Sequence, residues 1–89
     1  MRLLNTTTLT FEDYEVTEVP PYAILSHVWG EEEVLYHDII NKTAEQKKGY
    51  GKVFHTCQQA RWDGYHWAWI DSCCINKTDG VELTEGKQR

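Results

Sequence analysis

The stretch that decides the fold is Tyr22-Ala23-Ile24-Leu25-Ser26-His27-Val28-Trp29-Gly30. It follows two prolines, is apolar without interruption over its first four residues, and then carries Ser, His and Trp before a glycine. A short apolar run between Pro and Gly is typical of a strand that is buried on both faces, as in a parallel sheet. Open α/β sheets bind ligands beyond the carboxyl ends of such strands. We therefore expect residues 22–28 to form a central strand with a ligand site at its end.

A helix and a second strand follow. From Tyr50 onward, one helical face collects residues at i, i+3, i+4 and i+7 spacing, and Gly64 is a typical helix end. That face comprises Val53, Phe54, Cys57, Ala60 and Arg61. The stretch 66–75 then predicts a strand that ends in polar groups. A strand–helix–strand unit is right-handed and makes its two strands parallel, so their carboxyl ends share one edge. This edge should bring Ser26, His27 and Trp29 towards Asp71, Ser72 and Cys73.

The flanking segments carry weaker signals. Residues 2–5 and 9–11 are β-prone and predict a hairpin or two edge segments. Residues 34–41 fit helical spacing slightly better than a strand. The glutamates 31–33 indicate either a solvated turn or a charged lip beside a pocket. Thr43-x-x-Gln46 has the form of a capping box, although two glycines favour a helix start nearer Tyr50. A similar pattern, Asp79-x-x-Glu82, predicts a further helix near Gly80.

Composition limits the class of protein. A chain of 89 residues suffices for one small domain. The net charge of −5, with scattered basic residues, argues against nucleic acid. No stretch approaches a membrane span, and the amino-terminal residues do not resemble a signal peptide. The cysteine count of three is odd, and Cys73 and Cys74 are adjacent, so we expect reduced thiols in a reducing compartment. A cytoplasmic location follows as the expectation.

Two long motifs resemble those of the fungal heterokaryon incompatibility (HET) domain. The stretch 22–30 is similar to its opening motif, and Trp69-Ile70-Asp71-x-Cys73-Cys74-Ile75-Asn76-Lys77 is similar to its second motif. The segments Lys47-Lys48-Gly49-Tyr50 and Cys57-x-x-Ala60-x-x-Asp63-Gly64 also fit, as does the opening Met1-Arg2-Leu3-Leu4-Asn5. The resemblance therefore covers nearly the whole chain.

The resemblance implies a cytosolic fungal module for non-self recognition and programmed cell death. It implies a TIR-like, flavodoxin-like parallel sheet, here incomplete, with a strand–helix–strand core and amino-terminal β segments. Some TIR relatives cleave NAD at the nicotinamide–ribose bond by means of a glutamate, so NAD is a possible cofactor or substrate. The family domain continues into a third motif that this chain does not complete, so we expect residues 1–89 to be a truncated, partial HET domain. A protein partner or self-association is expected, without nucleic acid or membrane.

Each candidate site residue has an ordinary alternative. Ser26 and His27 are neighbours on a strand and diverge, so His27 is better suited to ligand contact than to activating a serine. Trp29, beside Gly30, is suited to stacking on a ligand ring, whereas Trp67 and Trp69 are expected in the core. The sequence lacks the paired cysteine spacing of structural zinc sites, and we expect no metal.

The carboxylates and thiols leave further alternatives open. Asp71 could hold a ribose hydroxyl or cap the following turn. Cys73 could contact a ligand or serve as a small buried residue. Glu82 and Glu85 are candidates for a catalytic carboxylate by analogy with glycosidic-bond cleavage, with Glu82 preferred; its alternative role is capping. The predicted cofactor-binding set is thus Ser26, His27, Trp29, Gly30, Asp71 and Cys73, with Glu82 as the catalytic candidate.

Overall fold

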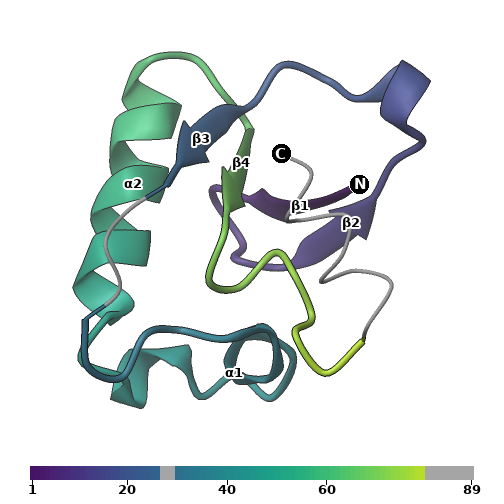
Figure 1. Cartoon of the computed structure of the whole chain (residues 1–89). Coiled ribbons are helices and arrows are strands. Elements are labelled where there is room, and N and C mark those ends of the chain that lie inside the picture. Colours follow the sequence, from purple (N-terminus) through teal and green to yellow (C-terminus); the bar gives the residue numbers. More distant parts are fainter. Residues whose placement is uncertain (27–29, 80–89) are drawn as a thin grey trace.

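The computed structural model describes residues 1–26 and 30–79 and contains a four-stranded sheet with helices beside it (Figure 1). The strands are β1 (Arg2–Asn5), β2 (Phe11–Asp13), β3 (Ala23–Leu25) and β4 (Trp67–Ile70), in the spatial order β2-β1-β4-β3. The helices are α1 (Tyr36–Ile40) and α2 (Tyr50–Trp62), and two short 3₁₀ turns cover Val16–Glu18 and Ala44–Gln46. The fold is therefore a small mixed α/β arrangement.

The amino-terminal residues form a hairpin, one of the two predicted arrangements, but its second strand covers Phe11–Asp13 and not residues 9–11. β1 and β2 pair antiparallel, with Leu3 opposite Glu12. The side chain of Asn5 accepts hydrogen bonds from the backbone N–H groups of Thr7 and Thr8, at 2.8 and 2.9 Å, which stabilises the turn. β1 also pairs antiparallel with β4. The sheet is thus mixed, and the expectation of a parallel sheet is correct only for β3 and β4, because the hairpin adds its first strand to β4 in the opposite direction.

β3 and β4 form the predicted parallel pair, with Ala23 opposite Ala68 and Leu25 opposite Ile70. The expectation that the first strand is buried on both faces is wrong, since 63% of the surface of Ile24 is exposed. β3 lies at the edge of the sheet. Because successive side chains of a strand point to opposite faces, Ile24 lies on the face opposite that of Leu25. Within the described residues the strand also ends at Leu25, earlier than predicted.

Helix α2 packs on β4 and supplies the predicted apolar face. Val53, Cys57 and Ala60 are buried, whereas Phe54 is 42% exposed. The helix begins at Tyr50, and the proposed capping box at Thr43 does not form, because the Thr43 side chain makes no capping hydrogen bond there. Gly64 adopts a φ of +90° just after the helix, which fits its role as the stop.

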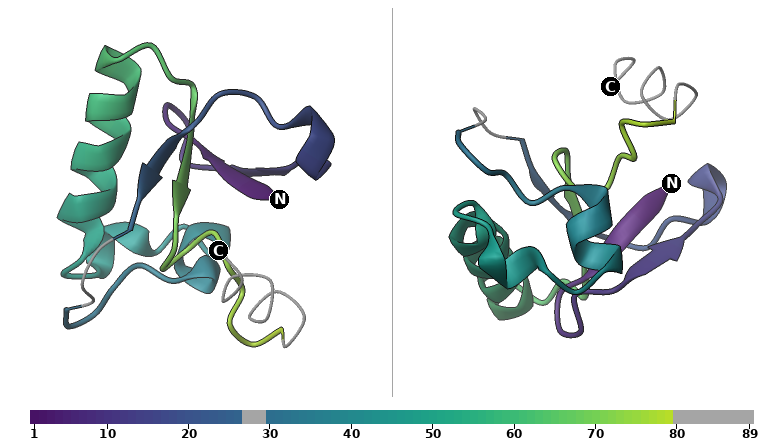
Figure 2. Two further views of the ribbon diagram at one scale, coloured as in Figure 1. Left: turned by 45° about the horizontal axis from the view of Figure 1, so that its top comes forward. Right: turned by 90° about the horizontal axis from the view of Figure 1, so that it is seen from below.

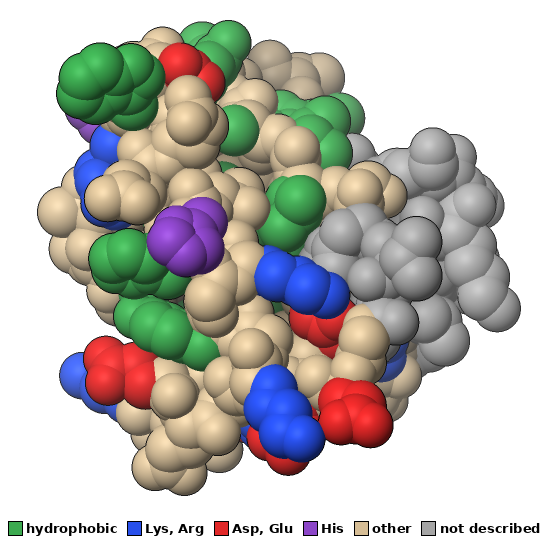
Figure 3. Space-filling view, turned by 90° about the vertical axis from the view of Figure 1, so that its left-hand side faces the viewer, with side chains coloured by type: hydrophobic (Ala, Val, Ile, Leu, Met, Phe, Trp, Pro, Cys, Tyr) green, Lys and Arg blue, Asp and Glu red, His purple; other side chains and the backbone are tan. Residues whose placement is uncertain are grey.

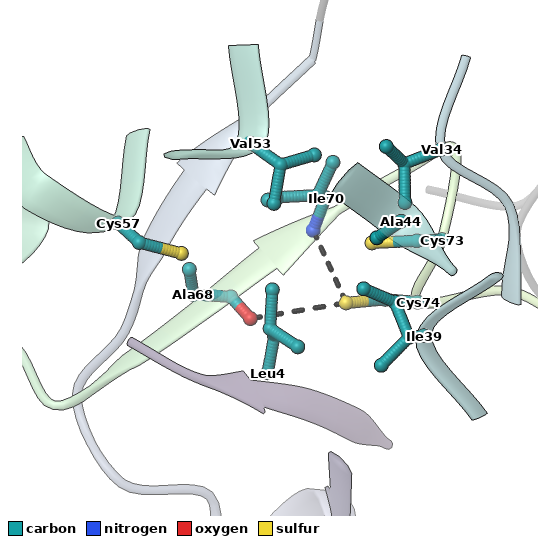
Figure 4. Packing of buried hydrophobic residues seen from close by; sticks show 10 residues of the cluster. All are labelled: Leu4, Val34, Ile39, Ala44, Val53, Cys57, Ala68, Ile70, Cys73 and Cys74. Atoms are coloured by element: carbon teal, nitrogen blue, oxygen red, sulfur yellow. Dashed lines mark hydrogen bonds between the residues drawn. The ribbon is translucent and has the colours of Figure 1, made fainter. Parts of the chain in front are cut away.

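The core lies between the sheet, α2 and the segment that carries α1 (Figure 4). Figures 1 and 2 show α1 at the end of the sheet where the arrows of β3 and β4 finish. Residues from all these elements meet there: Leu4, Val34, Ile39, Ala44, Val53, Cys57, Ala68, Ile70, Cys73 and Cys74. The segment between β3 and α2 therefore closes one end of the core. No helix in the described part of the chain is long and apolar enough to cross a membrane.

Candidate functional site

The carboxyl ends of β3 and β4 meet, as the sequence predicts. The backbone N–H of Asp71 donates to the carbonyl of Leu25 at 3.5 Å, which places Asp71 beside Ser26 at the edge of the sheet. Ser26 is exposed and Asp71 is half-buried. The predicted site residues His27, Trp29 and Glu82 lie outside the described residues. The parallel pair thus brings together Ser26 and Asp71, which are far apart in the sequence.

A lysine that the sequence analysis did not select adjoins this pair. The ammonium group of Lys77 donates to the backbone carbonyl of Asp71 at 2.8 Å. Partial burial lowers the pKa of Lys77, and the nearby Asp71 carboxylate opposes that effect. The following turn is stabilised by Asn76, whose side-chain oxygen accepts from the backbone and hydroxyl of Thr78 at 3.1 and 2.6 Å. The second motif therefore supplies a cation as well as a carboxylate.

Ser72 and Cys73 turn inward rather than to the open edge. Ser72 is 1% exposed, and its hydroxyl oxygen has no hydrogen-bond partner among the residues that the structure describes. Cys73 is fully buried and belongs to the core cluster (Figure 4). Its hydrogen bond with Cys74, together with burial, raises the pKa of the Cys73 thiol well above its usual value. Cys73 therefore stays a protonated thiol at neutral pH, and a thiolate nucleophile is not formed there.

Cys74 is held by the backbone of β4. Its sulfur accepts from the N–H of Ile70 at 3.3 Å and donates to the carbonyl of Ala68 at 3.8 Å (Figure 4). All three cysteines are reduced and buried. Burial also raises the pKa of Cys57 to about 11. The thiols of the second motif thus pack the core beneath the edge on which Ser26 lies.

The three glutamates that follow the first motif differ in their exposure to solvent. Glu31 and Glu32 are exposed, as expected for a solvated turn, but Glu33 is 5% exposed. One carboxylate oxygen of Glu33 accepts from the N–H of Gly30 at 2.5 Å and from the ammonium group of Lys52 at 2.8 Å. The interpretation of the whole triplet as solvated is therefore wrong for Glu33. A buried carboxylate requires such partners, because unpaired burial of its charge is costly.

Gly49 allows Glu33 to pack closely against the start of α2. The N–H of Gly49 donates to the carbonyl of Glu32 at 3.0 Å. A Cβ at Gly49 would lie 2.7 Å from a Glu33 carboxylate oxygen and 3.0 Å from the Glu32 carbonyl oxygen. Glu32 itself has a φ of +51°, the left-handed region. The absence of a side chain at Gly49 is thus what allows the loop after β3 to approach the helix.

A shallow groove of about 270 Å³ lies elsewhere, where the β1–β2 turn faces α1 and the start of α2. Its lining combines apolar side chains with hydroxyl groups and charges. The lining residues are Thr8, Leu9, Thr10, Asp38, Ile39, Lys42, Ala44, Glu45 and Tyr50. Of the predicted site residues that the structure describes, none lines it. The predicted site is therefore the edge formed by the strand ends, and this groove is separate from it.

Fold and site together define a small α/β domain with polar groups gathered at the carboxyl ends of two adjacent parallel strands. Residues 22–88 match the family described as "Heterokaryon incompatibility protein (HET)". The chain belongs to this family.

A characterised relative is the "Vegetative incompatibility protein HET-E-1" of Podospora anserina, which is 46% identical over 76 residues. That match covers 83% of this chain but 6% of the relative, so the chain spans a small fraction of the relative's length. No solved structure matches the chain.

Proposed function

We propose that this chain acts in heterokaryon incompatibility as a module that responds to non-self and triggers programmed cell death in a fungal cytoplasm. The observation that carries the proposal is the family match over residues 22–88, supported by the 46% identity to HET-E-1, whose name describes vegetative incompatibility. The matched residues include both strands whose ends form the candidate site. The site and the family signal therefore concern the same part of the chain.

The edge formed by Ser26 and Asp71 is the proposed ligand site. Open α/β sheets bind ligands at the carboxyl ends of parallel strands, and β3 and β4 are such a pair. The half-buried Asp71 carboxylate suits a ribose hydroxyl, and Lys77 adds a cation nearby. A TIR-like arrangement with a nucleotide such as NAD is consistent with these groups. The predicted contributions of His27, Trp29 and Gly30 are part of this proposal, whereas Cys73 packs in the core beneath the edge.

Induced expression in a filamentous fungus tests the proposed cell-death function. Expression of the wild-type chain should stop growth, and the cells should then stain as dead with a viability dye. Asp71→Asn should abolish this effect, whereas Asp63→Asn, an exposed carboxylate after α2, should not. Both variants must be compared at equal protein levels and equal unfolding midpoints. Cells that survive expression of the wild-type chain would contradict the proposal.

A second candidate is cleavage of NAD at the nicotinamide–ribose bond, with water as the acceptor and Glu82 as the carboxylate. The family resemblance and the polar sheet edge favour it. Nicotinamide release measured by chromatography, and its loss in Glu82→Ala, would support this activity. Growth arrest and concentration-dependent assembly without nicotinamide release would instead favour a module that acts through contact with itself or a partner.

Exposed apolar side chains support such contact. Trp62 is 84% exposed and Phe54 42% exposed, both on α2, and Ile24 is exposed on the edge strand. Figure 3 shows hydrophobic side chains distributed over the face that α2 presents, between charged and polar groups. Exposed large apolar groups of this kind are common where proteins associate. Sedimentation over a range of concentrations distinguishes self-association from contact with another protein.

A further inference from the structure

Charge is unevenly distributed along the chain. Residues 46–62, which include all of α2, contain no Asp or Glu, although the whole chain has a net charge of −5. The basic residues of this segment are Lys47, Lys48, Lys52 and Arg61. Residues 12–18, by contrast, contain no Lys or Arg, and their acidic residues are Glu12, Asp13, Glu15 and Glu18. The chain therefore carries one basic and one acidic segment.

The outer face of α2 combines exposed aromatic rings with a cation. Phe54, Gln58 and Trp62 are exposed at i, i+4 and i+8, so they follow one side of the helix, the side of the molecule seen in Figure 3. Beside them, the guanidinium of Arg61 donates to the carbonyl of Thr6, and no carboxylate of the described residues pairs with it. The lysines of the segment, in contrast, pair with carboxylates of their own chain. Arg61 therefore leaves a positive charge on this face that is open to a partner.

The acidic segment 12–18 lies on the opposite side of the molecule. It comprises most of β2, at one edge of the sheet, and the 3₁₀ turn Val16–Glu18, and Figures 1 and 2 show this turn and α2 at opposite ends. The side chains of Glu15 and Glu18 are exposed and have no ion-pair partner among the described residues. Val16, between them, is 68% exposed. The segment thus surrounds an apolar side chain with negative charge, which complements the face of α2.

We propose that the chain self-associates head to tail: the α2 face around Arg61 and Trp62 of one copy binds segment 12–18 of the next. This inference rests on the proposed function, in which the module acts through contact with itself. Pairing of α2 with α2 would bring two Arg61 side chains together, and pairing of two acidic segments would bring carboxylates together, so charge favours the unlike surfaces.

The position of the two surfaces decides the form of the assembly. Because they lie on opposite sides of one copy, each added copy leaves one surface of each kind free, and the assembly grows beyond a dimer. The exposed carboxylates on β2 oppose direct strand pairing at that edge of the sheet, so the contact is made by side chains.

Charge reversal on each surface tests the pairing in the full 89-residue chain. Sedimentation velocity over a range of concentrations should show wild-type assemblies larger than dimers, which dissociate as salt screens the charges. Arg61→Glu and the double variant Glu15→Lys/Glu18→Lys should each weaken assembly about tenfold or more, because like charges then face each other. An equimolar mixture of the two should assemble again, since each surface then meets its opposite on the other variant. Glu31→Lys/Glu32→Lys changes the net charge equally in another exposed loop and should assemble as the wild type does.

The mixture is the decisive measurement. A wild-type chain that stays monomeric, or a mixture that stays dissociated although both variants are folded, overturns the head-to-tail contact. A control that loses assembly as strongly as Glu15→Lys/Glu18→Lys also overturns it, because the effect would then follow net charge. Loss of assembly in Arg61→Glu alone would indicate a symmetric contact through α2 and overturns it as well. Should Arg61→Glu unfold because the bond to Thr6 is lost, Trp62→Glu takes its place with the same expected results, since Trp62 is 84% exposed.

Growth arrest on expression is scored separately from assembly. Arrest by a wild-type chain that does not assemble overturns the head-to-tail contact and leaves the proposed function standing. Assembly that the mixture restores, without growth arrest by the wild type, contradicts the proposed function and leaves the contact standing.

Discussion

The guanidinium carbon of Arg2 lies 4.4 Å from the centre of the Tyr36 ring, so the first strand and helix α1 are joined by a cation–π contact. The Tyr36 ring in turn stacks on Phe11 of β2 at 5.4 Å. Arg2 also donates to the carbonyl of Cys74 at 3.2 Å, just after β4. One side chain thus connects β1, α1 and the turn of the second motif.

Replacing Arg2 by Lys should destabilise the fold. Lysine keeps the charge but lacks the planar group that stacks on Tyr36 while it donates to Cys74, and the loss should be about 1–2 kcal/mol. Urea unfolding followed by tryptophan fluorescence measures it. Tyr36→Phe keeps an aromatic face and should retain most of the stability. Equal stability of Arg2→Lys and the wild type would show that the contact is energetically neutral.

The two glycines at the start of α2 should respond oppositely to alanine. Gly49→Ala would place its Cβ 3.0 Å from the backbone of Glu32 and Glu33, which no side-chain rotation relieves, and should cost about 1–3 kcal/mol. Gly51→Ala meets no atom of the described residues within 4 Å and should stabilise the helix by about 0.5–1 kcal/mol. Thermal unfolding of both variants checks this. A neutral Gly49→Ala would mean that the loop approach is easily relaxed.

Stability should fall at alkaline pH because of Cys57. Burial raises the pKa of this thiol to about 11 from an ordinary 9, so the folded state holds the proton more tightly than the unfolded state. The contribution of Cys57 is complete below pH 9 and is lost as pH rises to about 11, by roughly 2 kcal/mol. Urea unfolding at several pH values measures the slope. Cys57→Ala should flatten the slope in this window, and an unaltered slope would exclude Cys57 as its source.

Removing Trp62, the most exposed tryptophan in the described part of the chain, should affect association rather than folding. Trp62 is 84% exposed, so Trp62→Ser should change the free energy of unfolding by less than about 0.5 kcal/mol. Sedimentation should nevertheless show weaker self-association, if α2 carries the contact surface. Ile40→Ser removes an exposed apolar group on α1 and serves as the control. The same loss of association in Ile40→Ser would point to general hydrophobicity instead.

The strand–helix–strand core was predictable because its signals are local and agree. The buried face of α2, its start at Tyr50 and its end before Gly64 follow from helical spacing and glycine positions. The meeting of Ser26 with Asp71 follows from the handedness of parallel connections. The hairpin was also predictable as a local unit. The position of this hairpin beside β4 was not predictable. β1 and β4 are separated by most of the chain, and pairing between such distant strands produces no local sequence pattern.

The burial of individual polar residues was harder to predict from the sequence. Glu33 stands in a run of three glutamates and shows no periodicity that separates it from Glu31. Its burial depends on a lysine 19 positions later and on the glycine that admits the loop. Lys52 and Gly49 were both visible in the sequence, yet only the tertiary fold relates them to Glu33. The contact between Lys77 and the backbone of Asp71 could not be predicted either, because it too depends on the tertiary fold.

The strand order β2-β1-β4-β3 has a consequence for how the chain acquires its fold. β1 emerges first during synthesis, yet one of its two neighbours is β4, with Leu4 opposite Ala68. Until the ribosome has delivered the second motif, the hairpin presents the bare edge of an apolar strand. Closing that long loop carries a high entropic cost, which slows folding and exposes the nascent chain to aggregation. A sheet whose first strand lies between two others is therefore completed only after the second motif has been synthesised.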